Sequence, residues 1–404
     1  MAKPTSLKVS MIVHQYYYYD GRVRQYAEAL VKAGAKVDVL CVSGPASATT
    51  TASDGLRVFT IPLSRSYSGP GSYLVEYAIA LILYTLRLIA LSFRNRYDVI
   101  HVHNMPDFLI FAALIPRLLG AKLVLDIHDP TPEFFMSKYS KPATSKIARV
   151  MRLQERLSAR VAHAVITANP LFKERLVARG MPDNKVTVIR NEIGTTIFNR
   201  QQYEAARVQR SGHFTLLYPG TIAPRYGLDV AVRALPLLVG RIPDVRLQII
   251  GKQTDYSEEL RALAQQLGVE QHLELVPVVP MDEVPRYMAQ ADIGIYTAIS
   301  DPHMDVAVPT KVLEYAFMGL PVVAARLRIL EEMFVPSSLL FFEPKDVEGF
   351  AQKVVELYDC PERRVELVEE MDRTFVNVRQ GDQERQAYFR LLDSLVHGGL
   401  ADGE

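Results

Sequence analysis

Strand and helix patterns alternate along this chain. In the first half, buried strands are expected at 7–13 and 36–42, with an amphipathic helix at 22–33 between them. Three more strands are expected at 97–102, 121–127 and 164–167. Parallel strands need a long crossover that is usually a helix, so this alternation predicts an α/β fold with a parallel, doubly wound sheet.

The same alternation starts again after a polar stretch at 199–212. The second series of strands is expected at 214–218, 246–250, 273–277, 293–296 and 321–325. We therefore expect two Rossmann-like domains, 1–198 and 199–378, that meet across a cleft. A last amphipathic helix at 379–396 has no strand after it, so the terminal segment 379–404 can cross back to the first domain. Ligands of such sheets lie beyond the carboxyl ends of the strands, and the candidate residues are sought there.

The charge is distributed unevenly. The 404 residues carry a net charge of +1, but residues 1–195 hold 25 Lys and Arg against 14 Asp and Glu, and the rest hold 21 against 31. A basic half points to an anionic partner, and nucleic acid, anionic lipid and phosphorylated small molecules all fit. The first residues show no secretory signal pattern, and Cys41 and Cys360 make no metal-type spacing, so we expect a reduced, cytoplasmic location.

A turn with two glycines in the second half is suited to an anion. GTIAPRYGLD, residues 220–229, follows an expected strand and opens a helix. Gly220 lets backbone amides approach a phosphate, and Arg225 can clamp its oxygens. Taken alone, an ordinary turn with a solvated arginine is the simpler interpretation. No GxGxxG follows an expected strand, and Gly251 and Lys252 lie in a stretch without the upstream glycine of a P-loop.

A second helix start in the same half has similar chemistry. VPTKVLEYAFMGLPVV, residues 308–323, opens a core-facing helix with Thr310, Lys311 and Glu314. A capping cluster explains one such turn, and Glu314 could merely pair with Lys311. Two such turns in one half favour a nucleotide-diphosphate site, with cations for the phosphates and a carboxylate for the ribose hydroxyls.

Five stretches, spread over nearly the whole chain, resemble the retaining family 4 of GT-B glycosyltransferases. They are YYYYDGRVRQYAEALVKAGAKVDVL, YDVIHVHNMPDF, LVLDIHDPTPEFF, YPGTIAPRYGLDVAVRAL and VPTKVLEYAFMGLPVV. The resemblance is greatest to bacterial enzymes of surface-polysaccharide assembly. It implies two Rossmann-like domains and the transfer of a sugar from a nucleotide-diphosphate sugar to an acceptor.

On the donor side, the resemblance makes Glu314 the second glutamate of the family's E-x7-E motif, which holds the donor ribose. The first glutamate falls at Val306 and is absent, and Asp301 or Asp305 could replace it. Thr310 matches the loop whose backbone amide meets the terminal phosphate. The wider set of expected donor-binding residues is Gly21, Gly220, Thr221, Arg225, Gly251, Lys252, Val278, Thr310, Lys311 and Glu314.

The expected cations differ from the family pattern. That pattern carries an arginine after the first glycine of the phosphate loop and a lysine before the second, where this chain has Thr221 and Tyr226. Arg225 and Lys311 therefore become the expected cations. Gly21 is a single glycine in the first loop, where the family usually has a pair.

In the first half, the resemblance makes His128 the active-site histidine, near the donor sugar and the acceptor. Asp129 and Glu133 follow it, and together they form a plausible hydrogen-bonding set. Without the resemblance, a histidine satisfied by loop carboxylates is the simpler interpretation. His101 and His103 lie on one side of a strand, but no convincing third metal ligand is evident. We therefore expect no metal and give His103 a structural or acceptor-side role.

The stretch 73–93 is the most apolar part of the chain. Glu76 and Arg87 interrupt it, so we expect a helix that lies in the core or on a membrane surface rather than one that spans. In 145–162, five basic residues recur at helical spacing opposite apolar ones. A solvated basic face and a membrane-facing one fit this pattern equally well.

Taken together, the residues and the resemblance predict a retaining, metal-independent glycosyltransferase. His128, Arg225, Lys311 and Glu314 are the expected catalytic residues, and no cofactor is expected. A UDP-sugar is favoured over a GDP-sugar as donor, and a lipid-linked glycan at the inner face of the membrane as acceptor. The alternatives are a nucleotide-sugar epimerase of the same fold and a non-catalytic subunit that binds a nucleotide sugar.

Overall fold

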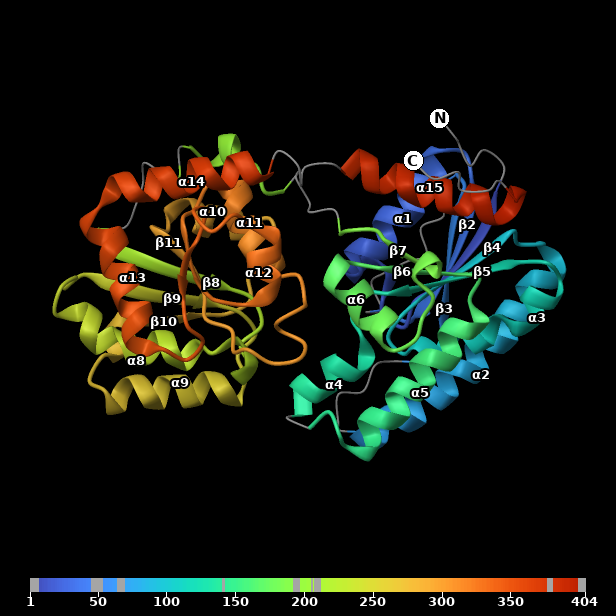
Figure 1. Cartoon of the computed structure of the whole chain (residues 1–404), viewed down its shortest axis with the longest axis horizontal. Coiled ribbons are helices and arrows are strands. Elements are labelled where there is room, and N and C mark those ends of the chain that lie inside the picture. Colours follow the sequence, from blue (N-terminus) through green and yellow to red (C-terminus); the bar gives the residue numbers. More distant parts are fainter. Residues whose placement is uncertain are drawn as a thin grey trace. The chain divides into compact units, whose positions relative to one another are not determined.

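The computed structural model describes residues 7–44, 54–63, 70–139, 142–191, 197–204, 206, 212–375 and 381–398. It divides the chain into two compact units (Figure 1). The first unit joins Met1–Glu192 to Gly381–Glu404, and the second is Ile193–Gln380. The last helix therefore belongs to the first unit, although it follows the second in sequence.

A parallel seven-stranded sheet forms the centre of the first unit, with strand order β3-β2-β1-β4-β5-β6-β7. The strands are β1 (Lys8–Ile12), β2 (Lys36–Val42), β3 (Leu56–Ile61), β4 (Val99–His103), β5 (Lys122–Ile127), β6 (Ala164–Thr167) and β7 (Val186–Val188). The helices are α1 (Gly21–Lys32), α2 (Pro70–Arg94), α3 (Leu114–Leu118), α4 (Thr131–Tyr139), α5 (Lys146–Val161), α6 (Pro170–Ala178) and α15 (Gly381–His397). Short 3-10 turns are η1 (Tyr17–Tyr19), η2 (Asp107–Ala113) and η3 (Asp183–Lys185).

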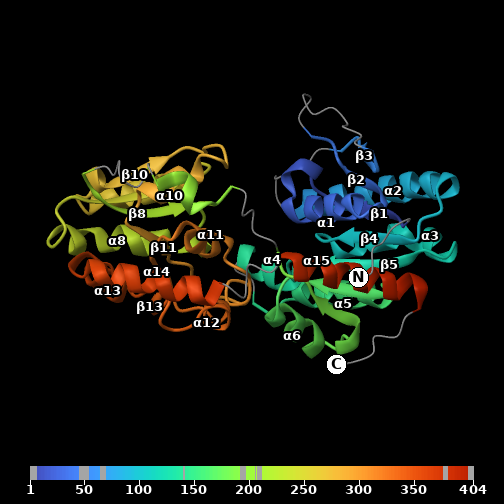
Figure 2. The ribbon, with the colours of Figure 1, turned by 90° about the horizontal axis from the view of Figure 1, so that it is seen from above.

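Helices cover both faces of this sheet, as a doubly wound fold requires. One face packs on α1 and α15, through Leu30 of α1 and through Tyr388 and Leu392 of α15. The other face packs on α2, η2, α5 and α6, through residues such as Tyr84 and Leu88 of α2. Figure 2 shows α1 and α15, from opposite ends of the sequence, on the same domain.

The second unit has a parallel six-stranded sheet, with strand order β10-β9-β8-β11-β12-β13. The strands are β8 (Phe214–Pro219), β9 (Val245–Ile250), β10 (Leu273–Val276), β11 (Ile293–Tyr296), β12 (Val322–Ala325) and β13 (Leu340–Phe342). The helices are α8 (Leu228–Val239), α9 (Asp255–Gln266), α10 (Val284–Gln290), α11 (Thr310–Met318), α12 (Arg328–Met333), α13 (Val347–Asp359) and α14 (Pro361–Phe375). Its 3-10 turns are η4 (Arg200–Tyr203), η5 (Pro224–Tyr226) and η6 (Glu270–His272).

In both sheets the strand order reverses direction beside the first strand of the unit. β1 lies between β2 and β4, and β8 lies between β9 and β11. The loops after these strands diverge there, which leaves room for a ligand at the carboxyl edge. The loops after β1 and β8 begin with the YYYYDG and GTIAPRYG stretches that the sequence singled out.

Candidate functional site

Three loops at the carboxyl edge of the second sheet are tied together by their backbones. The amide of Gly220, after β8, donates to the Ile250 carbonyl at the end of β9 (2.8 Å). The amide of Gly251 donates to the Val276 carbonyl at the end of β10 (3.0 Å). A Cβ atom at Gly251 would lie 2.1 Å from the Gly220 carbonyl oxygen. Gly251 therefore permits the close approach that positions Gly220.

The loop after β11 is attached to the turn that carries Arg225. Thr297 Oγ1 donates to the Tyr226 carbonyl (2.9 Å), and the amide of Ile299 donates to the Arg225 carbonyl (3.1 Å). Gly227 adopts the left-handed conformation, with φ at 58°. A Cβ atom at this position would lie 2.1 Å from the Thr297 carbonyl oxygen. The turn at 220–229, which carries Arg225, is thus held against the loop that leads to α11.

Lys311 reaches the glycine of this turn from α11. A Cβ atom at Gly220 would lie 2.9 Å from Lys311 Cε and 3.2 Å from its Nζ. The ammonium group lies 4.6 Å from the ring centre of Tyr226, 4.9 Å from that of Tyr218 and 5.6 Å from that of Tyr296. The structure therefore brings together the two turns that the sequence predicted to share an anion, and three aromatic faces hold the cation there.

The pKa values of Lys311 and Glu314 are shifted in opposite directions. Burial lowers the pKa of Lys311 to about 8, while the Glu314 charge opposes this shift and the Arg225 charge adds to it. Burial also raises the pKa of Glu314, against the effect of Lys311. Each charge is therefore poorly compensated, and a bound anion would restore the charged form of Lys311.

Thr310 is the first residue of α11, at the helix end where an anion is favoured. Its own amide donates to the Val308 carbonyl at 3.0 Å. A phosphate could accept from the Thr310 amide only by replacing this hydrogen bond.

The remaining donor-side candidates lie at the same edge of the sheet. Thr221 is exposed, and its carbonyl accepts from Tyr218 Oη (3.0 Å). Lys252 and Val278 follow β9 and β10, and both side chains are exposed.

Asp301 and Asp305, which could replace the missing glutamate, lie in the loop between β11 and α11. Oδ1 of Asp301 accepts from two backbone amides of that loop (both 2.8 Å), and Oδ2 of Asp305 accepts from Ser300 Oγ (2.8 Å). Val306, at the glutamate position, is fully buried. Both carboxylates therefore shape the loop, and the side chain at 306 contributes to the core.

In the first unit, Asp126 is a fully buried carboxylate at the end of β5. Arg22, the second residue of α1, binds both of its oxygens, with Nε 2.9 Å from Oδ2 and Nη2 3.0 Å from Oδ1. Nη1 of Arg22 also donates to the Ile189 carbonyl (2.9 Å) and to Asn191 Oδ1 (2.6 Å). Burial would raise the pKa of Asp126, but Arg22 and the neighbouring histidines hold it well below its usual value. The carboxylate is therefore ionised.

His128, just beyond β5, is bound to this carboxylate. Its Nε2 lies 3.3 Å from Asp126 Oδ2 and 3.1 Å from His103 Nδ1. His103 Nδ1 is itself 3.5 Å from the same oxygen. Burial lowers the pKa of His103, so this ring is neutral at pH 7. The structure thus brings His128 and His103 together, as an acceptor-side role for both requires.

The predicted contact between His128 and Glu133 is wrong. Glu133 lies in α4, where it is buried and bound by Arg179. Arg179 also donates to both oxygens of Glu155 in α5 (2.8 Å each). Glu133 therefore joins two helices instead of facing an acceptor, because its α4 position turns it toward the core. Asp129 contributes its carbonyl, which accepts from Asn104 Nδ2 (2.7 Å).

Gly21 begins α1, and Asp20 caps the helix by accepting from the Val23 amide (3.0 Å). A Cβ atom at Gly21 would meet no atom within 4 Å. The residue thus lies beside open space at the carboxyl edge of the first sheet, while Arg22 next to it is buried.

A third ligand does exist beside His101 and His103, contrary to the sequence-based expectation. Asp126 lies close enough that one ligand atom from each of the three residues falls within 4.8 Å of the others. However, Arg22 already binds both oxygens of this carboxylate, so a divalent cation would lie beside a buried positive charge. The chemistry of the cluster fits hydrogen bonding better than metal binding.

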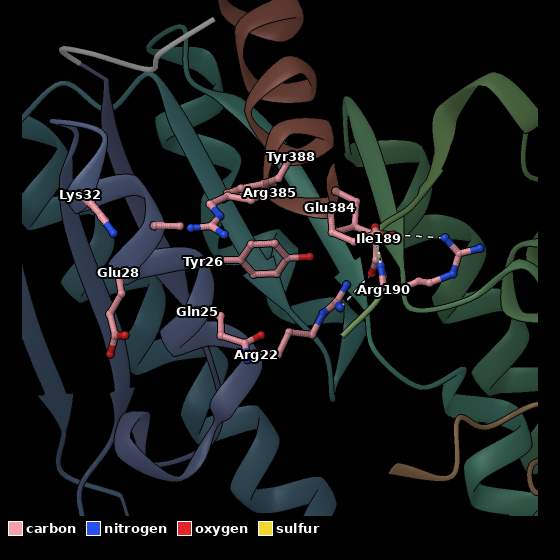
Figure 3. A pocket seen from close by; sticks show the side chains of 11 residues that line it. Arg22, Gln25, Tyr26, Glu28, Lys32, Ile189, Arg190, Glu384, Arg385 and Tyr388 are labelled. Atoms are coloured by element: carbon pink, nitrogen blue, oxygen red, sulfur yellow. Dashed lines mark hydrogen bonds and ion pairs between the residues drawn. The ribbon is translucent and has the colours of Figure 1, made fainter. Parts of the chain in front are cut away.

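Tyr388 of α15 completes this cluster and was missed from the sequence. Its Oη lies 2.9 Å from His101 Nδ1, and its ring centre lies 4.3 Å from that of Tyr26 in α1. A pocket between α1 and α15 borders the cluster (Figure 3). It is lined by Arg22, Gln25, Tyr26, Glu28, Ala29, Lys32, Ile189, Arg190, Glu384, Arg385 and Tyr388. The only signal for this contact was an amphipathic helix without a following strand.

A large apolar surface lies on the other side of the first unit. Its side chains are between 39% and 86% exposed. They are Val75, Ile79, Ile82, Leu86 and Phe93 of α2, Leu114, Ile115, Leu118 and Leu119 of α3 and its end, and Ile147, Val150, Leu153 and Leu157 of α5. We call this set the apolar face. On α5, the apolar residues Ile147, Val150 and Leu157 opposite the basic side are exposed.

The three helices of the apolar face lie in one layer. η2 contacts both α2 and α5, and α3 continues from it (Figure 1). Buried residues of α2 and α5 pack on the same sheet, so the exposed sides of these two helices point away from it. Among the described residues, α2 alone is long and apolar enough to cross a membrane, over Val75–Arg94. Here it packs on the sheet, with Tyr84 Oη donating to the Val13 carbonyl (2.9 Å).

Comparisons with known proteins agree with this arrangement. The model of the Glycosyl transferase 4-like domain matches residues 21–192, and that of Glycosyl transferases group 1 matches residues 199–373. A glycogen synthase of Mycobacterium tuberculosis is 27% identical over 355 residues, 84% of this chain and 82% of that protein.

Two further similarities concern shorter or more distant matches. A GDP-mannose-dependent alpha-(1-6)-phosphatidylinositol monomannoside mannosyltransferase of Mycolicibacterium smegmatis is 36% identical over 107 residues, 26% of this chain and 28% of that protein. The structure of the Anabaena protein HepE in complex with UDP covers 96% of this chain and 100% of its own, with a TM-score of 0.69 at 16% identity. The two parallel-sheet domains are those of the GT-B fold.

The ion pair of Arg22 and Asp126 leads to a prediction about stability. Replacing Arg22 with Met leaves a buried carboxylate without its counter-charge, which typically costs about 3–5 kcal/mol. We expect this loss in the free energy of unfolding of the first domain, measured by urea denaturation at pH 7. Without Arg22, burial raises the pKa of the Asp126 carboxyl group, so the loss should diminish toward acidic pH, as this group takes up a proton in the folded variant.

Arg24→Met is the matched control, two residues along the same helix. Arg24 forms an exposed pair with Glu28 at 3.2 Å, and such pairs contribute at most about 1 kcal/mol. Equal losses for the two variants would contradict the role given to Arg22.

Proposed function

Because the chain is a glycosyltransferase of the GT-B fold, we propose that it moves a sugar from a nucleotide-diphosphate sugar to a membrane-borne glycan acceptor, with retention at the anomeric carbon. A UDP-sugar is the favoured donor. The UDP complex of the similarly folded HepE supports this choice, whereas the mycobacterial mannosyltransferase is named for GDP-mannose.

One observation carries the proposal: Lys311 Nζ lies against Gly220, where two helix starts converge. In the proposed complex, the diphosphate lies between the Gly220 turn and the N-terminus of α11. Lys311 and Arg225 neutralise its charge, and Glu314 accepts hydrogen bonds from the ribose hydroxyls. This neutralisation stabilises the departing diphosphate, where negative charge grows in the transition state.

We propose that no resident metal is needed, since two side-chain cations and two helix ends serve the leaving group. The leaving phosphate oxygen itself helps to take the proton of the acceptor, so no protein nucleophile is required. His128, in the first domain, would contact the sugars near the anomeric carbon.

We propose that the acceptor is presented at an anionic membrane surface, where surface polysaccharides or glycolipids are assembled. The apolar face supplies thirteen exposed apolar side chains, and α5 adds Lys146, Arg149, Arg156 and Arg160, which are also exposed. A helix with exposed apolar side chains on one side and basic residues on the other can lie in the interface of an anionic bilayer. The mycobacterial relative is named for an acceptor of this type, a phosphatidylinositol mannoside.

The donor site predicts a loss of affinity in Lys311→Ala. Charge-assisted hydrogen bonds contribute about 1.5–3 kcal/mol each, so donor affinity should fall roughly ten- to hundred-fold. The measurement is calorimetric titration with UDP and a panel of UDP- and GDP-sugars, followed by a transfer assay. Release of UDP that requires an acceptor separates transfer from epimerisation and from binding alone.

The lowered pKa of Lys311 gives this prediction a second measurement. With a pKa of about 8 in the free protein, Lys311 loses its charge above pH 8, and donor affinity should fall there. Lys311→Arg stays charged, so its affinity should be nearly flat over the same range. Lys353→Ala, which removes a lysine from an exposed pair with Glu356 in α13, is the charge control. A Lys311→Ala variant with unchanged donor affinity would refute the site.

The proposed leaving-group chemistry also predicts that transfer persists in EDTA. Protein that has been dialysed against chelator should keep its turnover number, and added Mg²⁺ or Mn²⁺ should change it less than two-fold. Activity that disappears in EDTA and returns with either metal would overturn the metal-independent mechanism.

Membrane docking predicts co-sedimentation with vesicles. Binding should increase with the anionic lipid fraction and weaken in high salt, because each basic residue near such a surface contributes on the order of 1 kcal/mol. Ile82→Glu with Leu86→Glu should abolish binding, and Arg149→Glu with Arg156→Glu should weaken it at least ten-fold. Leu237→Glu, at an exposed apolar residue of the second unit, is the matched control. Wild-type protein that ignores anionic vesicles at low salt would refute docking and favour a soluble acceptor.

A further inference from the structure

We infer that Asp126 is a positioning residue for His128, fixing the ring with Nε2 turned inward and Nδ1 left as a hydrogen-bond acceptor. Tyr388 of α15 supports this arrangement from behind. The inference rests on the proposed function insofar as His128 acts on the sugars, but the orientation of the ring is a property of the free protein.

The chemistry of the carboxylate decides which nitrogen carries the proton. Both oxygens of Asp126 accept from Arg22, so the group is ionised and can only accept. His128 Nε2 lies 3.3 Å from Oδ2, a contact that is favourable when this nitrogen carries hydrogen. In the neutral ring, Nδ1 then has a free lone pair. Carboxylates select the histidine tautomer in this way in other enzymes.

His103 is compatible with this assignment. Its Nδ1 lies 3.1 Å from His128 Nε2, so it can share the same proton as a second acceptor. A neutral His103 then carries its own proton on Nε2, which has no hydrogen-bond partner among the described residues.

His101 and Tyr388 hold this ring from the other side. The rings of His101 and His103 are 4.1 Å apart between centres and tilted by 35°. His101 is held in turn by Tyr388 Oη at 2.9 Å. Arg22 and Tyr26 extend from α1 and Tyr388 from α15 toward one region (Figure 3). A residue near the end of the chain thereby reaches the cluster that orients His128.

The charged and titratable groups around the cluster come from four elements and one loop. They are Arg22 and Tyr26 of α1, His101 and His103 of β4, Asp126 of β5, Tyr388 of α15, and Asp20 before α1. Asp126 contacts the three histidines through a single oxygen, at 3.3 Å to 3.8 Å. It is therefore a negatively charged neighbour that all three rings share.

The test measures the tautomer of His128 directly, without substrate. In protein labelled with ¹⁵N-histidine, His128→Gln identifies the His128 signals. At a pH where the ring is neutral, we expect the wild-type ring to carry hydrogen on Nε2 alone. Asp126→Asn should lose this single tautomer, because an amide can also donate, and should lower kcat at least ten-fold. A wild-type ring protonated on Nδ1, or a tautomer unchanged in Asp126→Asn, would overturn the inference.

Tyr388→Phe is the second variant and retains the buried ion pair if Asp126→Asn does not fold. We expect kcat to fall about three- to ten-fold, with KM for the donor changed less than two-fold. Tyr84→Phe is the matched control, because it removes another buried hydroxyl of the same domain, bound to the Val13 carbonyl at 2.9 Å. If both variants keep the wild-type kcat, Tyr388 has no positioning role. If the protein shows the expected tautomer but no transfer activity, the proposed function is refuted and the positioning of His128 by Asp126 still holds.

Discussion

The first domain depends on a single buried carboxylate. Asp126 lies near the end of β5, an inner strand of the sheet, and is fully buried. Arg22 supplies the charge from the start of α1 and also holds the end of β7 through the Ile189 carbonyl. A buried ion pair of this kind adds little net stability compared with apolar residues, but it tolerates few arrangements. It therefore fixes the relative positions of α1, β5 and β7, and with them the loop of His128.

In the second domain the constraint is the position of a cation. Members of the family that the chain resembles carry cations within the phosphate loop, whereas here Thr221 and Tyr226 stand at those places. Lys311 reaches the same loop from α11, and Tyr226 lies beneath its ammonium group, 4.6 Å away. Tyr226, at the position of the family's lysine, thus supports the cation that takes the place of that lysine. A Cβ atom at position 220 would lie 2.9 Å from Lys311 Cε, so any other residue there would displace the end of the lysine side chain.

Residue patterns predicted much of the fold, and physical reasons separate the successes from the failures. β2, β6 and β11 have the expected bounds, because each is a buried run with clear boundaries. β3, β7 and β13 were not predicted, and β7 and β13 contain only three residues each. Such short strands are defined by pairing with a neighbour, which a local pattern cannot reveal.

The residues of the candidate site also divide into those that local sequence patterns predicted and those that they did not. Lys311 and Gly220 were predicted together because each lies in a segment that leads from a strand of one sheet into a helix. The partners of His128 were not: Asp126 is only two residues away, but its charge depends on Arg22 of α1, and His103 comes from the neighbouring strand β4. Glu133 shows the limit of proximity in sequence: five residues after His128, it binds Arg179 and Glu155 instead. Arg179 thereby joins α4, which follows the His128 loop, to α5 of the apolar face. A buried ionic contact thus connects the surface proposed to meet the membrane with the helix that follows His128.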